Sequence, residues 1–380
     1  MTRSRVVCEE NVGMARPTDL IRALLASPPD LPVVEVLPEL RERLSSGSDG
    51  VGACLVLTAP PGTGKTTLVP PLLADVLVRA GTTSGTGAGR GPGGEPGRVV
   101  VTQPRRIAAR TAARRLADLL GEEVGGTVGY AVRGERRTGP ATRIEVVTAG
   151  LLLRRLQRDP ELAGVDAVIL DEVHERSLEG DLLLALLTDA RAALREDLTL
   201  VAMSATLDAD RLRRILGGTS GGVAPLVEVP GRLHPLEEVW APPGRTGRLG
   251  PCGVPREFLT HVAATVERAL AEHSGDLLAF LPGAREVDDV VARLRDAAHE
   301  GVDVLPLHGR LPASAQDAAL TPSPAGRRRV VVSTNVAESS LTVPGVRVVV
   351  DSTLAREPRL DVARSMSGLV TVGVSRAAGV

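Results

Sequence analysis

Short apolar runs alternate with amphipathic stretches from residue 53 to residue 204. The runs have the length and the β-branched content of buried strands, and the stretches between them have the spacing of helices. The predicted strands are Cys54–Thr58, Val99–Thr102, Ile144–Thr148, Ala167–Leu170 and Leu198–Met203. The predicted helices cover residues 66–79, 107–120, 149–157 and 180–194. Strands that alternate with helices predict an α/β domain with a parallel sheet covered on both faces.

A second series of the same kind follows a glycine-rich break at residues 217–222. Its predicted helices and strands cover residues 256–273, 277–281, 284–298, 302–305, 313–320, 330–333 and 346–350. We therefore expect two tandem α/β domains with parallel sheets, at residues 51–222 and 223–380, after a lead-in segment at residues 1–50. The glycine-rich residues 81–97 predict a flexible surface insertion. Ligands of such sheets bind beyond the carboxyl ends of the strands, which predicts a site in a cleft between the domains.

The first predicted strand and helix flank the segment Ala59-Pro60-Pro61-Gly62-Thr63-Gly64-Lys65-Thr66-Thr67. A glycine-rich loop in this position can cradle phosphates with its backbone N–H groups and the helix N-terminus. The predicted nucleotide-binding residues are Pro61, Gly62, Thr63, Gly64, Lys65, Thr66 and Thr67. Lys65 is expected to reach the β- and γ-phosphates, and the Thr66 hydroxyl to bind Mg²⁺. Ala59 replaces the first glycine of the usual pattern, and the alternative interpretation is an ordinary glycine-rich turn.

Lys65 is the only lysine among the 45 Lys and Arg residues of the chain. A composition rich in Ala, Arg, Gly and Pro indicates a coding bias that has replaced lysine by arginine elsewhere. The compact ammonium of lysine suits the narrow space between two phosphates better than a planar guanidinium does. Retention of lysine at this position therefore favours the phosphate-binding interpretation.

A second candidate for chemistry begins where the fourth predicted strand ends, in Asp171-Glu172-Val173-His174-Glu175. Asp171 is predicted to hold Mg²⁺, and Glu172 to orient and deprotonate an attacking water. An acidic run after a strand can also be a solvated loop, and the presence of Lys65 in the same domain favours the catalytic interpretation. His174 and Glu175 do not complete the H-E-x-x-H pattern, which excludes a zinc peptidase.

The composition is that of an ordinary soluble globular protein, with 43% apolar and 24% charged residues. Aromatic residues make up only 1% of the chain, so base stacking can contribute little to any nucleic-acid binding. The net charge of −1 argues against a wholly cationic surface but allows local basic stripes. One such stripe is predicted at Arg105, Arg106, Arg110, Arg114 and Arg115. The last two can equally belong to a solvated helix face.

Cys8, Cys54 and Cys252 are too far apart to form a CxxC pair. This spacing argues against a zinc site and a disulfide framework, and it fits a reducing cytoplasm. No apolar run reaches the roughly 18 residues of a membrane span, so no membrane segment is expected. The arginine-bearing start of the chain also lacks the apolar core of an export signal.

These segments together resemble the motifs of the DEAH-box branch of superfamily 2 helicases, and within it the bacterial HrpB-type ATP-dependent helicases. In the first domain the matching segments are Gly62-x-Gly64-Lys65-Thr66, Thr102-Gln103-Pro104-Arg105-Arg106, Asp171-Glu172-Val173-His174 and Ser204-Ala205-Thr206. In the second domain they are Phe280-Leu281-Pro282-Gly283, Leu307-His308-Gly309 and residues 333–342. The order and spacing of the segments also match those of the family.

The resemblance implies two tandem RecA-like P-loop domains that close over ATP and Mg²⁺ and step along single-stranded nucleic acid. It adds His174 to the catalytic residues and makes Ser204, Ala205 and Thr206 the coupling segment. The implied nucleic-acid contacts are Gln103, Arg105, Arg106, Thr148, Gly283, Ser333, Thr334 and Asn335. Isolated Ser and Thr residues at strand ends can instead be helix caps. RNA is favoured over DNA as the partner, although no residue indicates a 2′-hydroxyl contact, and no oligomeric state is indicated.

The end of the chain departs from the family pattern. The family's Gln-Arg-x-Gly-Arg-x-Gly-Arg motif, whose arginines stabilise charge on the γ-phosphate, is expected to begin where the chain reads Val374 to Val380. We therefore expect a helicase core truncated before its arginine fingers, each worth roughly 10³–10⁵ in rate. The alternative is a weak or inactive module that binds ATP and nucleic acid. An unrelated phosphate-loop enzyme, such as a kinase, would need a substrate pocket in place of residues 333–342.

Overall fold

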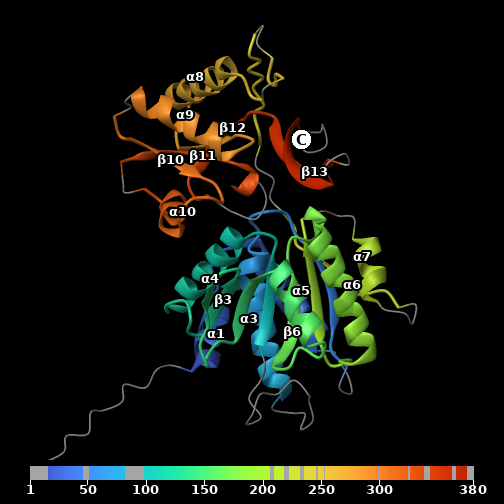
Figure 1. Cartoon of the computed structure of the whole chain (residues 1–380). Helices are drawn as coiled ribbons and strands as arrows, with labels where there is room; N and C mark the ends of the chain where they lie inside the picture. The colour runs from blue at the N-terminus through green and yellow to red at the C-terminus, as the bar shows by residue number, and fades with distance from the viewer. Residues whose placement is uncertain are drawn as a thin grey trace, which may run out of the picture. The chain divides into compact units, whose positions relative to one another are not determined.

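The structure is a computed structural model that describes residues 16–45, 51–81, 98–205, 209–217, 222–231, 235–244, 247–251, 253–297, 300–323, 326–337, 343–361 and 365–374. The chain divides into two compact units, one ending at Arg232 and one beginning at Leu233. The predicted insertion at 81–97 lies outside the described residues except for Gly81. Each unit has its own sheet (Figure 1), and the prediction of an α/β fold with parallel sheets is confirmed.

The first unit is built on an eight-stranded sheet of order β4-β3-β5-β2-β6-β7-β1-β8. Its strands are β1 (Cys54–Thr58), β2 (Arg98–Gln103), β3 (Val128–Val132), β4 (Glu135–Arg137), β5 (Ile144–Thr148), β6 (Val165–Leu170), β7 (Thr199–Ser204) and β8 (Leu226–Glu228). All neighbouring pairs are parallel except the β3–β4 hairpin. The carboxyl ends of the parallel strands therefore meet at one edge, which is where a ligand site is expected.

Helices cover both faces of this sheet (Figure 1). One face carries α1 (Pro17–Ala26), η1 (Pro32–Val36), α2 (Leu37–Ser45), α3 (Lys65–Gly81) and α4 (Arg106–Leu120). The other carries α5 (Ala149–Arg158), α6 (Leu178–Ala193) and α7 (Asp210–Leu216). Successive strand side chains alternate between the two cores, as Leu55 and Leu57 enter one core and Val56 the other. Burial on both faces explains why the strands read as continuous apolar runs.

Two predicted boundaries of the first domain are wrong. The segment interpreted as a lead-in is part of the domain, because Ile21, Val33 and Leu40 are almost completely buried in the core beside α3. The domain also extends past the predicted boundary at residue 222, because β8 pairs with β1 as the last strand of the sheet. A three-residue strand carries too few positions to show a period in the sequence.

The second unit contains a four-stranded parallel sheet of order β10-β11-β9-β12. Its elements are α8 (Arg256–Glu272), β9 (Asp276–Phe280), α9 (Ala284–Asp296), β10 (Val302–Leu307), α10 (Ala313–Leu320), β11 (Arg328–Ser333), η3 (Asn335–Ala337) and β12 (Val346–Asp351). Helices α8 and α9 share one apolar core with the sheet. A separate antiparallel hairpin of β13 (Leu354–Asp361) and β14 (Met366–Gly373) follows, and it was not predicted.

Arg329, on β11, holds several loops of the second unit together. Its side chain is 1% exposed and donates from Nε to Asp276 at 2.8 Å. Its two terminal nitrogens donate to the carbonyl oxygens of Ala319, Thr321 and Pro344. The planar fork of arginine supplies donors in several directions, so one buried side chain satisfies acceptors from separate segments.

Asp75 joins the N-terminal helices to α3. Its carboxylate is 2% exposed and accepts hydrogen bonds from Arg22 on α1 at 3.1 Å, Arg41 on α2 at 2.6 Å and Arg79 on α3 at 2.9 Å. Burial by itself raises the pKa of Asp75, but the three arginine bonds outweigh it and hold the pKa below its ordinary value. The charged form of Asp75 therefore stabilises the folded first unit.

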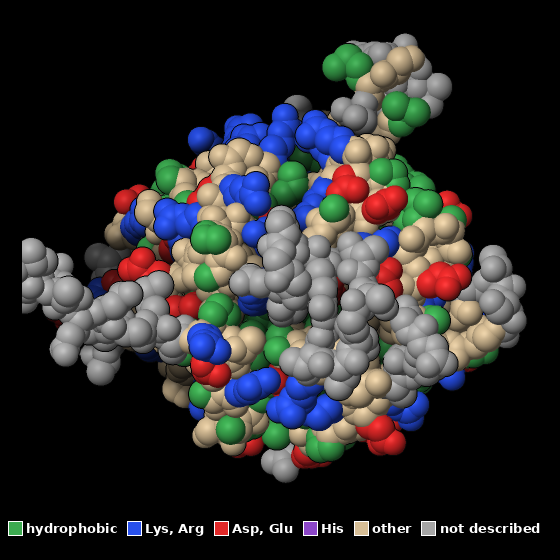
Figure 2. Space-filling model, turned by 90° about the horizontal axis from the view of Figure 1, so that it is seen from below, with side chains coloured by type: hydrophobic (Ala, Val, Ile, Leu, Met, Phe, Trp, Pro, Cys, Tyr) green, Lys and Arg blue, Asp and Glu red, His purple; other side chains and the backbone are tan. Residues whose placement is uncertain are grey.

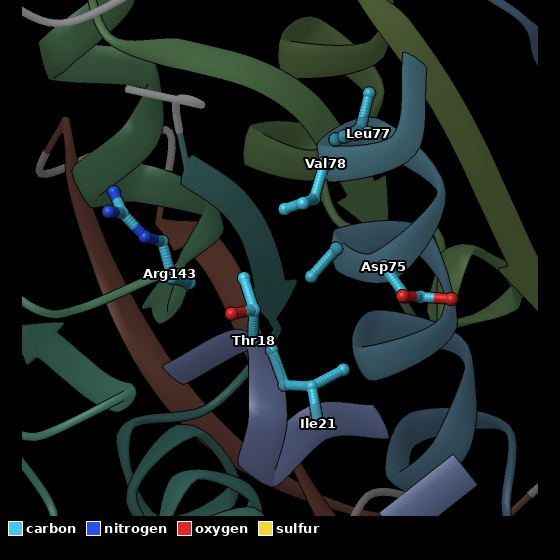
Figure 3. A pocket seen from close by; sticks show the side chains of 7 residues that line it. Thr18, Ile21, Asp75, Leu77, Val78 and Arg143 are labelled. Atoms are coloured by element: carbon cyan, nitrogen blue, oxygen red, sulfur yellow. The ribbon is translucent and has the colours of Figure 1, made fainter. Parts of the chain in front are cut away.

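A small cavity lies beside Asp75, where α1, α3 and the residue preceding β5 meet. Figure 3 shows Thr18 and Ile21 on one side of it, Leu77 and Val78 on another, and Arg143 across from them. Its volume of about 10 Å³ is no more than one water molecule needs. We conclude that this is a packing gap rather than a ligand site. In the described part of the chain, no helix is long and apolar enough to cross a membrane.

The arginine cluster generates a prediction about stability. Asp75→Asn removes the charge that three arginines share, and we expect a loss of about 1–3 kcal/mol in the free energy of unfolding at pH 7. Because the folded-state pKa is lowered, this contribution is present above the ordinary pKa of about 4 and disappears as the pH falls through the folded-state value. Urea unfolding at several pH values tests this, with Glu42→Gln, an exposed carboxylate on α2, as control. An Asp75→Asn deficit that stays constant down to pH 2 would contradict the explanation.

Candidate nucleotide-binding site

The predicted phosphate loop lies between β1 and α3, at the carboxyl edge of the first sheet. Gly62 and Gly64 have φ values of +78° and +89°, a region that side chains with a Cβ rarely adopt. Thr63 is buried, and its hydroxyl donates to the carbonyl oxygen of Pro60 at 2.8 Å. Helix α3 begins at Lys65, so the first amides of the helix have no acceptor within it and can bind an anion.

Lys65 and Glu172 form a buried ion pair. Their side chains are 6% and 8% exposed, and Lys65 Nζ lies 3.2 Å from Glu172 Oε1. Burial, followed by the charge of Asp171, raises the pKa of Glu172 to about 7. The predicted phosphate ligand and the predicted base therefore lie in direct contact, although residues 65 and 172 are 107 positions apart in the sequence.

Asp171 is the centre of a hydrogen-bond cluster at the end of β6. Its Oδ2 accepts from the Thr66 hydroxyl at 2.5 Å and from Gln103 Nε2 at 2.7 Å, and its Oδ1 accepts from the Glu172 amide at 2.9 Å. Burial raises the pKa of Asp171 above its ordinary range. The two predicted metal ligands, Thr66 and Asp171, are thus adjacent oxygen donors, which is the ligand type that Mg²⁺ prefers.

The backbone turns sharply after Asp171. Glu172 has φ +55° and Arg176 has φ +49°, on either side of the short helix η2 (Val173–Glu175). A left-handed conformation at a residue other than glycine costs about 1–2 kcal/mol and persists only where the surrounding structure holds it. The hydrogen bonds of Asp171 and the Lys65–Glu172 pair hold this turn in place.

His174 connects the acidic segment to the end of β7. The Ala205 amide donates to His174 Nδ1 at 3.2 Å, and the same nitrogen lies 3.4 Å from Glu172 Oε2. Burial, followed by the charge of Lys65, lowers the pKa of His174. Because Nδ1 accepts from the Ala205 amide, the neutral ring carries its proton on Nε2. Ser204 is buried beside this contact, and Thr206 lies outside the described residues.

Three of the predicted nucleic-acid residues lie at the carboxyl ends of β2 and β5, which are neighbours in the sheet. Arg105 precedes α4 and pairs with Glu175 at 3.5 Å, and Arg106 is exposed at the first position of α4. Thr148 is half-buried and precedes α5. These residues share one edge of the first unit with the phosphate loop. Their contact with nucleic acid remains a prediction.

The location of Gln103 departs from the predicted nucleic-acid role. Its side chain is 2% exposed, and its amide donates to Asp171. The motif contains both Gln103 and Arg105, but Gln103 is the last residue of β2, whereas Arg105 lies beyond the strand and directly before α4. Gln103 therefore supports the candidate metal ligand instead of facing a free surface.

In the second unit, Ser333 and Gly283 are also placed differently from the prediction. Ser333 is completely buried, and its hydroxyl oxygen lies within hydrogen-bond distance of two carbonyl oxygens, that of Leu307 at 3.1 Å and that of Thr334 at 2.7 Å. Gly283 is buried where a Cβ would lie 2.5 Å from Arg356 Cζ. Thr334 is half-buried and Asn335 is exposed. Residues 338–342 of the same motif lie outside the described residues.

One contact to the phosphate loop was missed in the sequence. The Val33 amide, in the supposed lead-in segment, donates to the carbonyl oxygen of Thr63 at 3.0 Å. A backbone amide leaves no trace in a residue pattern, so only the apolar pair Val33-Val34 after Pro32 could have drawn attention to this segment.

Comparison with known proteins agrees with this geometry. The sequence matches the DEAD/DEAH box helicase domain over residues 42–215 and the helicase conserved C-terminal domain over residues 260–366. One match lies in each structural unit. The chain belongs to the DEAD/DEAH-box helicases. This result confirms the family resemblance that the motifs indicated.

Individual relatives give the same result. The chain is 43% identical over 349 residues to the ATP-dependent RNA helicase HrpB of Escherichia coli, covering 91% of the chain and 39% of HrpB. It is 38% identical to the human ATP-dependent RNA helicase DHX30, covering 85% of the chain and 27% of DHX30. The crystal structure of Escherichia coli HrpB superposes with a TM-score of 0.75 at 42% identity, covering 92% of the chain and 40% of that structure. The chain thus spans well under half the length of these relatives.

The position of Gln103 generates a prediction. In Gln103→Ala the Asp171 carboxylate loses one of its donors, worth about 1 kcal/mol, so the Kd for Mg²⁺-nucleotide should rise about five-fold. Affinity for single-stranded RNA should not change, since the side chain is buried. Nucleotide titration and RNA binding by fluorescence anisotropy provide both measurements.

Arg106→Ala is the matched comparison for Gln103→Ala. The side chain of Arg106 is exposed, so its removal should weaken RNA binding without changing nucleotide affinity. The slope of the RNA-binding constant against salt concentration should fall by the equivalent of about one phosphate contact. If Gln103→Ala weakens RNA binding as much as Arg106→Ala does, the nucleic-acid assignment of Gln103 is correct after all.

Proposed function

We propose that this chain is the ATP-hydrolysing core of a DEAH-box RNA helicase, which couples hydrolysis to movement along a single strand. The observation that carries the proposal is the contact of Lys65 with Glu172 beside the bonded pair of Thr66 and Asp171. The proposed phosphate ligand, base and two metal ligands thus lie together, at the start of α3 and directly after β6. The printed names of HrpB and DHX30, both ATP-dependent RNA helicases, support the choice of nucleotide and of RNA.

Thr66 and Asp171 are suitable ligands for a magnesium ion. Their oxygens lie 2.5 Å apart, and Gln103 and the Glu172 amide orient the Asp171 carboxylate. Mg²⁺ held at Thr66 and Asp171 would neutralise charge on the β- and γ-phosphate oxygens. Gln103 keeps its role in this arrangement, because it binds the carboxylate oxygen and fixes the direction in which the carboxylate points.

Lys65 has two possible anionic partners in the proposed reaction. In the structure it binds Glu172, and a triphosphate in the loop would offer its ammonium several charged oxygens instead. Transfer of Lys65 to those oxygens leaves Glu172 available to orient the attacking water and accept its proton. His174 Nδ1 accepts from the Ala205 amide at the end of β7 and lies 3.4 Å from Glu172 Oε2. We propose this contact as the route by which a change at Glu172 reaches the coupling segment.

Nucleic-acid binding is proposed at the edge formed by Arg105, Arg106 and Thr148. The net charge of −1 argues against a uniformly basic surface, and Figure 2 shows basic and acidic side chains in separate groups on the face seen from below. Binding must therefore depend on local contacts to phosphates rather than on a uniformly basic surface. Thr334 and Asn335 of the second unit are further proposed contacts, and the proposal includes a cytoplasmic location, which the sparse cysteines favour.

The first test of this function is nucleotide binding. Lys65→Ala removes a charged donor to the phosphates, worth about 1.5–3 kcal/mol, so the Kd for Mg²⁺-ATP should rise roughly 10- to 150-fold. Glu172→Gln is the matched comparison, because it removes the other half of the same buried pair but should retain nucleotide binding. Equal affinity of the wild type and Lys65→Ala in calorimetric titration would rule out the role of Lys65.

The second test is hydrolysis. Glu172→Gln removes the base while preserving the shape of the side chain, and we expect phosphate release to fall about 10²- to 10⁴-fold. Release should be measured with and without single-stranded RNA, on wild type and variant in parallel. If the wild type releases phosphate no faster than Glu172→Gln does, the chain binds the nucleotide without hydrolysing it.

A further inference from the structure

The segment that includes Leu31 and Val33 contacts the phosphate loop from outside the recognised motifs. Val33 is completely buried at the start of η1, and its amide donates to the Thr63 carbonyl oxygen at 3.0 Å. Thr63 lies in the middle of the loop, between the two glycines with positive φ. The hydrogen bond therefore acts at the point where the loop backbone is least restricted by its own residues.

This hydrogen bond fixes the orientation of one peptide unit. In a planar trans peptide, the carbonyl oxygen of Thr63 and the amide hydrogen of Gly64 point in opposite directions. With the carbonyl directed at Val33, the Gly64 amide is directed away from the N-terminal segment. An amide in the middle of a phosphate loop has to point toward the phosphates in order to bind them.

Leu31 restricts the same part of the loop by packing. A Cβ at Gly64 would lie 2.6 Å from Leu31 Cδ1 and 3.0 Å from Leu31 Cβ, so the leucine occupies the space beside the glycine backbone. Leu31 itself is partly buried against the core of the first unit. The Gly64 backbone therefore has an apolar wall on this side, which prevents the loop from moving toward the N-terminal segment.

The segment is attached firmly to the helix that follows the loop. Arg22 and Arg41, on either side of it, both bind Asp75 on α3. Asp75 lies about 15 Å along the helix from Lys65, at 1.5 Å per residue. Leu24 and Leu40 share a core with Leu68 and Leu72 of α3. The N-terminal segment is thus held at two separated places on the loop and its helix.

We propose that Leu31 and Val33 are positioning residues of the nucleotide site, which hold the Thr63–Gly64 peptide in the orientation that binds phosphate. The inference rests on the proposed function, since it assigns these residues to the same site. Neither residue touches the nucleotide in this proposal, and both act through the loop backbone. In this proposal the N-terminal segment orients the phosphate loop in addition to packing in the core.

The principal test compares two leucines of the same segment. Leu31→Ala removes the wall beside Gly64, whereas Leu25→Ala shortens a leucine that packs against the same core from α1. Both variants should lower the melting temperature. Only Leu31→Ala should raise the Kd for Mg²⁺-ADP, by about ten-fold. The titration is run at 10 °C, after circular dichroism has established that both variants are folded at that temperature. Leu31→Met, which conserves volume, should restore the affinity.

The Val33 hydrogen bond is tested without changing a side chain. Replacing the Val33 amide by an ester removes the N–H that donates to Thr63, and we expect a rise in the Kd for Mg²⁺-ADP of five-fold or more. The same replacement at Ser27 is the control, because the amide of Ser27 donates to Ala23 of α1 and touches neither Leu31 nor the loop. The ester also serves as the second measurement if Leu31→Ala does not fold.

The outcomes separate this inference from the proposed function. If the wild type binds Mg²⁺-ADP and Lys65→Ala does not, the site is a nucleotide site. In that case, equal Kd values for Leu31→Ala and Leu25→Ala, or for the two esters, overturn the positioning role alone. If the wild type does not bind the nucleotide, the proposed function and this inference both fail.

Discussion

The Asp171 carboxylate is the acceptor on which the arrangement of the site depends. It receives the Thr66 hydroxyl from the start of α3, the Gln103 amide from the end of β2 and the backbone amide of Glu172. These donors come from distant parts of the sequence, and they meet because parallel strands place all their carboxyl ends at one edge of the sheet. A buried carboxylate without these donors would be costly, so the fold and the site stabilise each other.

The sequence predicted the parts of the site that need a specific side chain. Lys65 and Glu172 were assigned separately from a glycine-rich loop and an acidic strand end, and the structure brings them within 3.2 Å. Gln103 was predicted to contact nucleic acid, whereas in the structure its buried side chain donates to Asp171, because a motif records which residues accompany one another and not what each side chain contacts. The contact of Val33 with Thr63 could not be predicted at all, since a backbone amide is the same for nearly every residue.

The fold could also be predicted in part, namely where burial leaves an apolar pattern in the sequence. Strands buried on both faces, such as β2 and β6, must be apolar throughout and stand out in the sequence. The hairpin of β13 and β14 does not stand out, because Pro358 and several charged side chains interrupt its first strand. The N-terminal helices α1 and α2 were misinterpreted because prolines surround them, although proline is well tolerated in the first turn of a helix.

The single lysine of the chain and its buried arginines have different kinds of hydrogen-bond partners. Buried arginines such as Arg195 and Arg329 donate from several nitrogens to carbonyl oxygens and a carboxylate at once, which the planar fork allows. Lys65 is also buried, but its described partner is one carboxylate, and its proposed partners are phosphate oxygens in a narrow loop. A guanidinium carries five donors in a fixed fork, and each buried donor left without an acceptor costs about 1–3 kcal/mol. The compact ammonium of lysine therefore suits the proposed phosphate site better than a guanidinium does.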